Sequence, residues 1–461
     1  MRLFGLLALI PLALLADVTV TPGVWDLYRG STIATRGFAT LDACAKAADE
    51  LNVVRAYTCR TRATVAVTAD APPPPPPDPT PIPVAGVYTD LASAPVGAWV
   101  TTYCNGSKLV TQYTGAPFPA CGRTISIATH QGRVLEVTPA TIKAAVASWQ
   151  PGDVLYLRAG TYSGVICSDG WNGDSNFDVC PSAATAARPI AIVGYPGEVA
   201  TLTGAGSRPN FVLGKGGPDK REYLTIANLN LIANSDCIDS GANTGTVATE
   251  TGAAHVRVVG NTCTITNATG NTMTGLIAIG GDDWKVLGNT WKDPANRTVI
   301  NNNHVIYVQN GADDVEIAYN VLVGLHVGHV IQVHQDGGGS LLYERIHIHD
   351  NLLRANSPAD MRGITASLVA DASTILIENN RIENVGQGDW GWLNVYRGQV
   401  TARGNVALRT QGGVNVNGAY GGTRKVTLDD NQICLASGSR LNAENGASLS
   451  QITETNPRSC P

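Results

Sequence analysis

The chain has 461 residues, a formal net charge of −5 and a charged fraction of 15%. This length exceeds that of one ordinary compact domain. The negative balance, without any run of Lys or Arg, disfavours nucleic acid as a partner. Fifty glycines and an aromatic fraction of 6% suit a structure that is rich in turns.

Residues 1–16 (MRLFGLLALIPLALLA) begin with one basic residue, continue with an apolar stretch and end on a small residue. This order is typical of a secretory signal peptide. The apolar stretch is too short to serve as a bilayer-spanning anchor. We therefore predict a protein that is secreted, periplasmic or on the cell surface, with no membrane span after cleavage near Ala16.

Cysteine usage agrees with export. The ten cysteines are even in number, and none forms a CxxC pattern of the kind used for zinc or redox chemistry. Taken in order they make five pairs of near neighbours, each of which would close a short loop. The pairs are Cys44–Cys59, Cys104–Cys121, Cys167–Cys180, Cys237–Cys263 and Cys434–Cys460. The sequence alone does not prove this connectivity.

Residues 17–71 are expected to form a small disulfide-containing module, with strands near 25–28 and 56–68 and an Ala-rich helix at 41–51. Residues 72–83 contain six consecutive prolines followed by DPTPIP, which is typical of a semi-rigid polyproline spacer. Such a spacer holds two folded bodies apart. We interpret the module as a unit for attachment or binding, to a cell surface or a virion, rather than as part of a catalytic site.

Residues 84–137 form a second β-rich segment, which is either a separate module or an extension of a cap. Thr138 and Pro139 then provide the N-cap and the first position of a short amphipathic helix. The apolar face of this helix consists of Ile142, Val146 and Trp149. A helix face of this kind would close the open end of a stack of strands, whose edges otherwise invite aggregation.

A repeat of two aliphatic positions followed by Asn runs through the C-terminal half of the chain. Its asparagines recur every 25 to 31 residues, as Asn261, Asn289, Asn320, Asn351, Asn380, Asn405 and Asn431. Short strands within such a period predict a β-solenoid, in which each strand pairs with its equivalents in the neighbouring coils. An Asn at the same corner of every coil can form a ladder of stacked amides. We predict an all-β parallel solenoid of about ten coils over residues 138–436, and a C-terminal tail or cap over 437–461.

Two segments ahead of this repeat resemble a known family. GDVLYLRAGTYSG (152–164) and RPIAIVGYPGE (188–198) are similar to the opening coils of right-handed parallel β-helix proteins of the pectate-lyase-like superfamily. The resemblance implies a carbohydrate ligand, since the superfamily includes polysaccharide lyases, hydrolases, epimerases, esterases and phage tailspikes that only bind. It does not choose a reaction. The chain has no Asp-Pro-His-Asp epimerase signature and no clear cluster of three carboxylates for Ca2+, so calcium stays open as a cofactor.

Six segments of the solenoid align as strands in one register, and they begin at Gly275, His304, His329, Arg362, Gly391 and Gly412. The third and fifth residues of each are mostly aliphatic and are expected in the core, so the fourth and sixth should point outward. The outward residues form one column of Ala278, Tyr307, Gln332, Thr365, Asn394 and Asn415, and another of Gly280, Gln309, His334, Ser367, Tyr396 and Asn417. Trp390 and Trp392 lie beside these columns. Amides and aromatic rings with few charges predict a carbohydrate groove.

A lyase for a uronate-containing polysaccharide must neutralise a carboxylate, remove the C5 proton and protonate the leaving oxygen. We predict His334 as the base, because an ordinary His titrates near neutral pH. Tyr307 or Tyr396 would serve as the acid, and Arg362 or Arg397 as the carboxylate clamp. Substrate-binding residues are expected to be Gln332, Ser367, Asn394, Arg397, Trp390, Trp392, Asn415 and Asn417.

The other histidines receive structural interpretations. His304 and His329 have the parity of core positions at the start of a strand, so we interpret them as turn-packing residues. His347 and His349 are expected on a solvated face, and they are the only close pair that metal binding would favour. No carboxylates are obviously aimed at that pair, so we predict no metal site there.

Two other functions stay open. A non-catalytic glycan-binding, adhesion or tailspike-like protein would use the same groove, and the N-terminal module with its spacer fits this role. A glycoside hydrolase needs two carboxylates about 5 to 9 Å apart, and the aligned columns contain none. That reaction would depend on Asp336, Asp360 and Asp389 in the neighbouring loops. The predicted partner is a polysaccharide in each case.

Overall fold

The computed structural model describes five strands before residue 129, and then residues 132–460 apart from short gaps. The gaps are 165–166, 169–183, 196–197, 205–208, 215–220, 235, 241–251, 267–276, 293–303, 326–327, 335–340, 356–361 and 387–389. The predicted signal peptide, the helix at 41–51 and the proline-rich linker lie outside the described residues. The chain divides into two units, Met1–Val84 and Ala85–Pro461.

The first unit contains a three-stranded antiparallel sheet in the order β2-β1-β3. Its strands are β1 (Trp25–Arg29), β2 (Thr32–Phe38) and β3 (Thr58–Thr61). In the second unit, an antiparallel pair of strands precedes the solenoid. These are β4 (Trp99–Thr102) and β5 (Thr124–Ala128).

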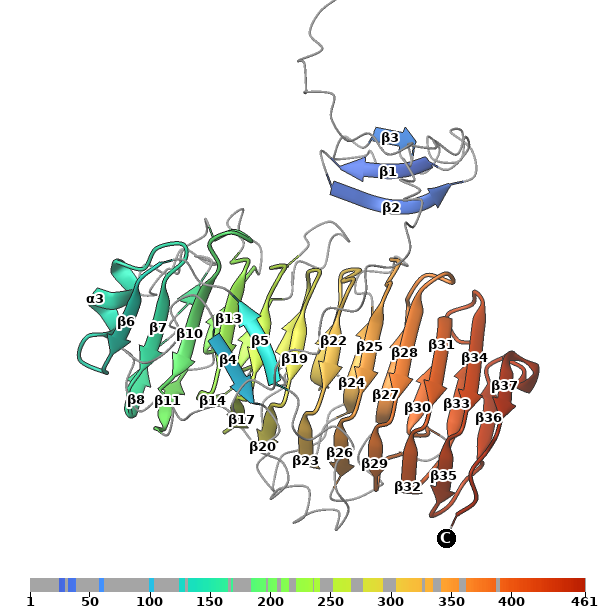
Figure 1. Cartoon of the computed structure of the whole chain (residues 1–461). Helices are drawn as coiled ribbons and strands as arrows, with labels where there is room; N and C mark the ends of the chain where they lie inside the picture. Colours follow the sequence, from blue (N-terminus) through green and yellow to red (C-terminus); the bar gives the residue numbers. More distant parts are fainter. Residues whose placement is uncertain are drawn as a thin grey trace, which may run out of the picture. The chain divides into compact units, whose positions relative to one another are not determined.

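From β6 onward the chain forms a right-handed parallel β-helix, in which each coil contributes strands to three long sheets (Figure 1). Within the described residues the first sheet has twelve strands and the other two have ten each. The first sheet comprises β6 (Val134–Val137), β7 (Val154–Leu157), β10 (Ile190–Gly194), β13 (Leu224–Ala227), β16 (Arg257–Val259), β19 (Lys285–Leu287), β22 (Glu316–Ala318), β25 (Ile346–His349), β28 (Thr374–Glu378), β31 (Gly398–Arg403), β34 (Arg424–Asp429) and β37 (Ile452–Thr455).

The second and third sheets follow the same order of coils. The second comprises β8 (Gly160–Ser163), β11 (Ala200–Thr203), β14 (Asn230–Ala233), β17 (Thr262–Ile265), β20 (Thr290–Lys292), β23 (Val321–Leu325), β26 (Leu352–Ala355), β29 (Arg381–Glu383), β32 (Val406–Thr410) and β35 (Gln432–Leu435). The third comprises β9 (Cys167–Ser168), β12 (Phe211–Val212), β15 (Ile238–Asp239), β18 (Ile277–Ile279), β21 (His304–Val308), β24 (His329–His334), β27 (Arg362–Ser367), β30 (Leu393–Val395), β33 (Val414–Asn417) and β36 (Leu441–Glu444). The sheets therefore extend beyond the predicted range 138–436 at both ends.

The repeated asparagines form the predicted ladder at the corner between the first and second sheets. Each Asn from Asn261 to Asn405 donates its Nδ2 to the Oδ1 of the next Asn, over 2.9 to 3.1 Å. The same Oδ1 accepts the backbone N–H of the preceding Asn, so every corner amide is satisfied although it is buried. Because a buried amide without partners is costly, this ladder holds the coils in register.

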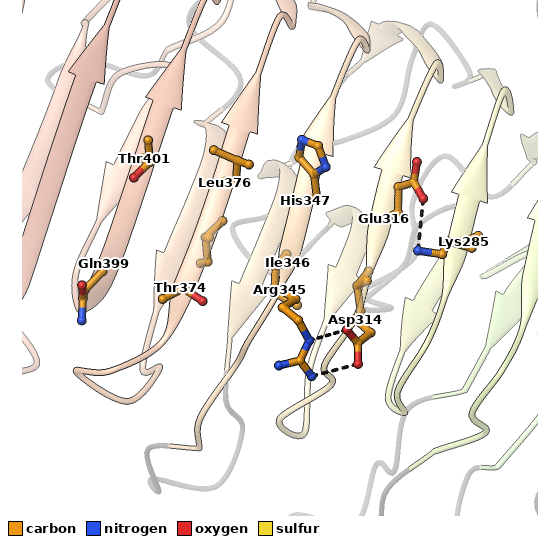
Figure 2. A pocket seen from close by; sticks show the side chains of 12 residues that line it. Lys285, Asp314, Glu316, Arg345, Ile346, His347, Thr374, Leu376, Gln399 and Thr401 are labelled. Atoms are coloured by element: carbon orange, nitrogen blue, oxygen red, sulfur yellow. Dashed lines mark hydrogen bonds and ion pairs between the residues drawn. The ribbon is translucent and has the colours of Figure 1, made fainter. Parts of the chain in front are cut away.

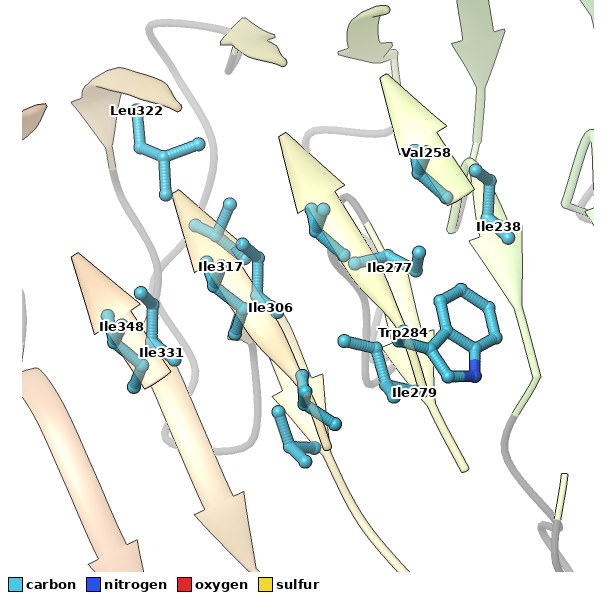
Figure 3. Close-up of a cluster of buried hydrophobic side chains, with 14 of the residues drawn as sticks. Ile238, Val258, Ile277, Ile279, Trp284, Ile306, Ile317, Leu322, Ile331 and Ile348 are labelled. Carbon is cyan, nitrogen blue, oxygen red and sulfur yellow. The ribbon is translucent and has the colours of Figure 1, made fainter. Parts of the chain in front are cut away.

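Aliphatic side chains from all three sheets meet in one continuous core, part of which Figure 3 shows. Ile277, Ile306 and Ile331 stack from coil to coil on the third sheet, and Ile317 and Ile348 do so on the first. The strands are short and rich in β-branched residues, which suit a half-buried surface. Each strand buries one row of its side chains in this interior. The core therefore grows by one layer with each coil.

A short helix packs on the first coil of the solenoid, and a shorter 3-10 helix precedes its last strand. The helix α3 (Ile142–Ala147) has Thr141 as its N-cap, three residues later than predicted, and it buries Ile142 and Val146 against the first coil. Trp149, which follows the helix, is buried in the same cluster as predicted. At the other end, the 3-10 helix η4 (Leu449–Gln451) begins with a capping box at Ser448 and leads into β37.

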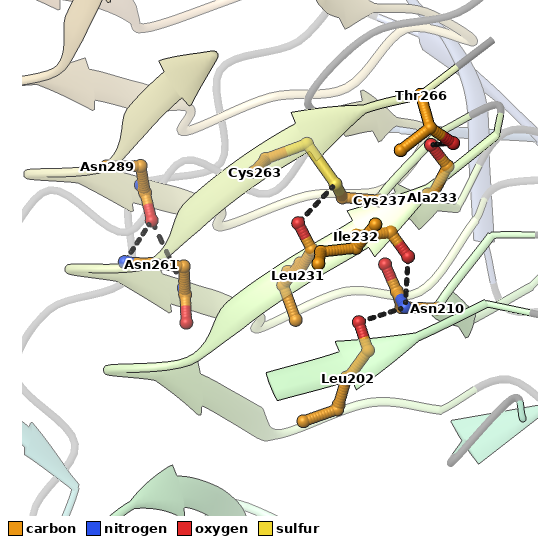
Figure 4. Close-up of a disulfide and its surroundings, with 10 residues drawn as sticks. All are labelled: Leu202, Asn210, Leu231, Ile232, Ala233, Cys237, Asn261, Cys263, Thr266 and Asn289. Carbon is orange, nitrogen blue, oxygen red and sulfur yellow. Dashed lines mark hydrogen bonds between the residues drawn. A yellow bond between two sulfur atoms is a disulfide. The ribbon is translucent and has the colours of Figure 1, made fainter. Parts of the chain in front are cut away.

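Two of the predicted disulfides are present in the described residues. Cys237 bonds to Cys263, beside the start of the asparagine ladder (Figure 4), and Cys434 bonds to Cys460. Both link a coil to its neighbour across 26 residues of sequence. The other three predicted pairs involve side chains outside the described residues. The two observed bonds confirm that near neighbours pair.

Candidate functional site

The third sheet has the register that the sequence predicts. Tyr307 pairs with Gln332, Gln332 with Thr365, and the column continues through Asn394 and Asn415. In the second column, His334 pairs with Ser367. The aliphatic residues between them lie in the core. We call the outward surface of this sheet from β21 to β33 the His334 face.

The alternation of side chains fails at the start of these strands. Val305 and Ile306 both point into the core, as do Val330 and Ile331, so the residue ahead of each pair turns outward. His304 therefore stacks on Tyr307, with ring centroids 4.5 Å apart. The core parity assigned to His304 and His329 is therefore incorrect, but both side chains are buried, as residues that pack at a turn would be.

The same break in alternation occurs at Trp392, which was predicted to bind a sugar ring. Trp392 and Leu393 are consecutive core residues, and the indole of Trp392 is fully buried. It therefore offers no surface to a sugar ring. The sequence contains a signal for this, since paired apolar residues occur at the second and third positions of four of the six aligned strands.

His334 lies at the centre of a hydrogen-bonded group. Its Nδ1 is 2.8 Å from Ser367 Oγ, and Gln332 Nε2 donates to the same oxygen over 3.0 Å. The hydroxyl of Tyr343, a core residue, donates to the backbone carbonyl of His334 over 2.6 Å. The ring of His334 lies 6.1 Å from that of Tyr307. His334 is thus held in place beside a tyrosine, with part of its surface exposed.

His329 connects this group to Arg362. Arg362 Nη1 donates to His329 Nε2 over 3.1 Å, because a guanidinium has only donors. The proton of His329 therefore sits on Nδ1 and is donated to Thr365 Oγ1 over 2.9 Å. Burial, together with the nearby charge of Arg362, holds the pKa of His329 well below its usual range. Burial likewise lowers the pKa of His304, to about 3. Both imidazoles are neutral at ordinary pH.

Arg362 is the charged group of the His334 face. Its guanidinium lies 3.2 Å from the centroid of the Trp390 ring, in a cation–π contact. In the described part of the chain it forms no ion pair, and its Nε is buried without a hydrogen-bond partner. Burial lowers the pKa of Arg362, because few surrounding groups compensate its charge. A buried donor without a partner calls for an explanation such as a ligand.

Aromatic rings continue the site from Trp390. The Trp390 and Tyr396 rings lie 5.9 Å apart, and Tyr396 and Tyr420 lie 5.1 Å apart. Burial raises the pKa of Tyr396 above its ordinary value, with partial opposition from Arg362. Tyr396 therefore gives up its proton less readily than an ordinary tyrosine, which favours Tyr307 of the two predicted acids.

Four predicted ligand-binding side chains are already engaged by the protein. Arg397 forms an ion pair with Asp371 over 2.8 Å, so it is not available as a clamp. Asn394 is fully buried and donates to Gly391 O over 3.0 Å. Asn415 and Asn417 are also buried, and both donate to Glu444 Oε2. Short amides in a sheet are covered by their longer neighbours, so an outward direction did not make these groups accessible.

A second candidate lies on the outward surface of the first sheet from β19 to β31, which we call the His347 face. It contains a hollow of about 510 Å3 lined by Lys285, Asp314, Val315, Glu316, Arg345, Ile346, His347, Thr374, Ile375, Leu376, Gln399 and Thr401 (Figure 2). Its charges are paired within the protein. Lys285 contacts Glu316 at 3.1 Å, His347 contacts Glu378 at 2.9 Å, and Arg345 contacts Asp314.

His349 anchors the charge network of the His347 face. Its Nε2 contacts Glu316 at 3.1 Å and its Nδ1 contacts Asp350 at 2.8 Å. Burial opposes the charged form, but the bonds to Asp350 and Glu316 outweigh it and raise the pKa of His349 to about 9. The prediction of a solvated face was therefore wrong for His349, which is buried, whereas His347 is part-exposed.

Among the described residues, no group of three or more His, Cys, Asp or Glu side chains is arranged to hold a metal ion. Asp336, Asp360 and Asp389, on which a hydrolase would depend, lie outside the described residues. None of the described helices is long and apolar enough to cross a membrane.

The sequence matches no known family profile and no curated protein. The structure is similar to a mannuronic acid specific polysaccharide family 6 lyase from the human gut microbiota, at 13% identity over 72% of this chain and 92% of that chain, with a TM-score of 0.39. It is also similar to an alginate lyase from Paenibacillus sp., at 14% identity over 71% and 96% of the two chains, with a TM-score of 0.39. A pectate lyase matches at 12% identity over 71% and 80%, with a TM-score of 0.38. At these values the likeness does not indicate a reaction. The structure itself shows the fold, a right-handed parallel β-helix, and the function has to be argued from the His334 face.

Proposed function

We propose that the protein is an exported polysaccharide lyase that cleaves a uronate-containing polysaccharide by β-elimination on the His334 face. The observation that carries the proposal is a convergence. His334 and Tyr307 lie with their rings 6.1 Å apart, on the same face as Arg362, a guanidinium without an ion pair in the described residues. A uronate chain that lies across this face can meet a base, an acid and a cation.

Each group supplies one part of the reaction. Arg362 pairs with the uronate carboxylate and stabilises the negative charge that develops when the neighbouring C5 proton leaves. His334 accepts that proton, and the electron pair forms the C4–C5 double bond as the C4–O bond breaks. Tyr307 then protonates the departing glycosidic oxygen. His304 and His329 stay neutral, so they do not add to the positive charge that Arg362 presents.

Ser367 and Gln332 position the base rather than react. The Ser367 hydroxyl is bonded to both His334 Nδ1 and Gln332 Nε2, and its side chain is buried. A ring held in this way loses little freedom when the substrate binds, which favours proton transfer from a fixed direction. Both residues therefore act through His334.

A hydrolase has less support on this face. The described carboxylates next to this face, Asp371 and Glu444, are bonded to Arg397 and to the amides of Asn415 and Asn417. A glycosidase needs two carboxylates directed at one bond. Export is supported by the two disulfides, because such bonds persist in oxidising compartments.

The test is an elimination assay on a panel of polyuronates, with and without calcium, that follows the ultraviolet absorption of unsaturated uronate products. We expect His334→Ala to lower kcat by about 100-fold or more, the range for loss of a general base. His347→Ala, on the outward surface of the first sheet, is the matched control, and we expect it to keep the activity of the wild type. Thermal unfolding of both variants shows that they are folded.

The alternative outcomes are distinct. Loss of activity in His347→Ala but not in His334→Ala would move the site to the hollow of Figure 2. New reducing ends without ultraviolet absorption would indicate a hydrolase. Retention on immobilised glycans without any product would leave a binding or adhesion protein.

A further inference from the structure

Tyr420 is an exposed aromatic ring at the end of the His334 face. Its side chain is 48% exposed, whereas Tyr396, whose ring lies 5.1 Å away, is buried. In the described part of the chain, the large apolar side chains that are exposed to this degree are Val199, Tyr420 and Leu449, so Tyr420 is the aromatic one. Single exposed apolar side chains are common on protein surfaces, so the case for Tyr420 depends on how its loop is held and on the rings beside it.

The loop that carries Tyr420 is fixed from below by Arg424. The buried Arg424 guanidinium donates from Nη2 to Gly421 O over 2.7 Å and to Gly422 O over 2.9 Å. Its Nε donates to Tyr396 O over 3.0 Å. One side chain therefore sets the positions of both Tyr396 and the Tyr420 loop. Within the loop, Gly421 N donates to Gly418 O over 3.0 Å.

The Arg397–Asp371 ion pair fixes the same loop from the side. Gly421 and Gly422 have φ values of 62° and 70°, which favour glycine. A side chain at Gly422 would collide with Arg397 and Asp371, so the loop packs closely against this pair. Arg397, predicted as a ligand for substrate, thus holds the loop that presents Tyr420.

An aromatic side chain on a loop that is already ordered is suited to binding, because little conformational entropy is lost when a ligand arrives. The ring also continues an existing strip. Arg362 lies over Trp390, Trp390 is 5.9 Å from Tyr396, and Tyr396 is 5.1 Å from Tyr420. The strip passes from the coil of β27 through that of β30 to that of β33, so it extends along the solenoid axis.

We propose that Tyr420 is an anchor for a sugar ring that lies several units away from the bond cleaved beside His334. The polysaccharide then runs along the solenoid axis, with one acidic unit at Arg362 and a later unit stacked on Tyr420. From β24, which carries His334, to β33, which precedes the Tyr420 loop, there are three coil steps. At the ordinary strand spacing this is roughly 14 Å, which only an oligosaccharide spans. The prediction of a uronate ligand rests on the proposed function. The anchor requires only that Tyr420 binds a sugar ring.

The experiment measures binding by titration calorimetry in a His334→Ala background, which prevents turnover. The probes are uronate disaccharides and octasaccharides. We expect Tyr420→Ala to weaken octasaccharide binding roughly fivefold to tenfold, the loss expected for one aromatic contact, and to leave disaccharide binding unchanged. Tyr420→Phe keeps the ring and should bind like the parent. Leu449→Ala, at a residue that is 51% exposed, is the matched surface control.

The results separate the two proposals. A selective loss of octasaccharide binding supports the anchor even when wild-type protein forms no unsaturated product. Absence of that product contradicts only the proposed lyase activity. Equal affinities of Tyr420→Ala and its parent for the octasaccharide overturn the anchor, as does an equal loss for both ligand lengths. Absence of saccharide binding by the parent overturns it too.

Discussion

The His334 face and the His347 face contain similar residues but differ in how their charges are compensated. On the His347 face, His347, His349 and Lys285 each contact a carboxylate of a neighbouring strand or corner. On the His334 face, the neutral His329 donates to a threonine, and Arg362 contacts an imidazole and an indole. The chain therefore places a closed ion network on one sheet and an uncompensated cation on another.

This difference distinguishes a structural cluster from a candidate site. Paired charges between adjacent coils stabilise the stack and leave little attraction for an incoming ion. A cation packed against aromatic rings retains its attraction for an anion, because the surrounding groups have not neutralised it. The sequence places histidines at a similar density on both faces, so this density does not distinguish them. The hydrogen-bond and ion-pair partners of these side chains do.

The largest expected effect is a loss of stability on the His347 face. Replacing His349 by Asn leaves Glu316 and the buried Asp350 without their shared cation. We expect the free energy of unfolding to fall by about 2–4 kcal/mol, the cost of breaking a largely buried ion pair. Denaturant unfolding measures it, and a change below about 0.5 kcal/mol, the size usual for surface substitutions, would show that the network is not structural.

The same network predicts how stability depends on pH. The pKa of His349 is raised to about 9, so its contribution is complete below its ordinary value of 6.5 and is lost as pH rises through about 9. The hydrogen bond from His349, aided by Lys285 and opposed by burial, lowers the pKa of Glu316 to about 2. Its contribution is complete above its ordinary value of 4.5 and is lost as pH falls through about 2. Melting temperature should therefore be highest between these ordinary values, and His349→Asn should flatten the alkaline decline.

An intermediate effect is expected from Arg362. Arg362→Gln removes the charge that we propose for the uronate carboxylate, and we expect kcat/KM on polyuronate to fall about 10- to 100-fold, as for a lost hydrogen bond to a charged group. Arg345→Gln on the His347 face is the control, because Arg345 is already paired with Asp314. Equal activity of the two variants would contradict the contrast between the faces.

The smallest effect is expected from Ser367, which touches His334 rather than the substrate. Ser367→Ala should lower kcat by roughly 2- to 10-fold, as for one neutral hydrogen bond, and shift the kinetic pKa that reports His334. A merely structural residue would change stability without moving that pKa. Ser367→Thr keeps the hydroxyl and should restore the pH profile.

The repeat by itself predicts much of this architecture. The spacing of the asparagines, the register of the third sheet and two disulfide pairs were all readable from local pattern. They were readable because a solenoid repeats one set of contacts in each coil, so that a sequence period is also a spatial period.

The errors share one physical cause, which is that strands in this solenoid begin with a bend. Two consecutive residues point inward there, so strict alternation reversed the directions of Trp392, His304 and His329. Arg397 was misassigned for another reason, since Asp371, its partner, is 26 residues earlier in the chain. The Tyr420 loop has no repeat signal, because it lies outside the strands.

The spacing of the repeat and the alternation of apolar residues thus determined the solenoid and the rows of its core. They also determined the part of the third sheet on which His334, Tyr307 and Gln332 meet. They could do so because neighbours within a strand and between coils follow from backbone geometry alone. Only the tertiary structure decided which outward groups are paired, covered or available. That depends on side chains from different coils and corners, whose hydrogen bonds and ion pairs no sequence interval specifies.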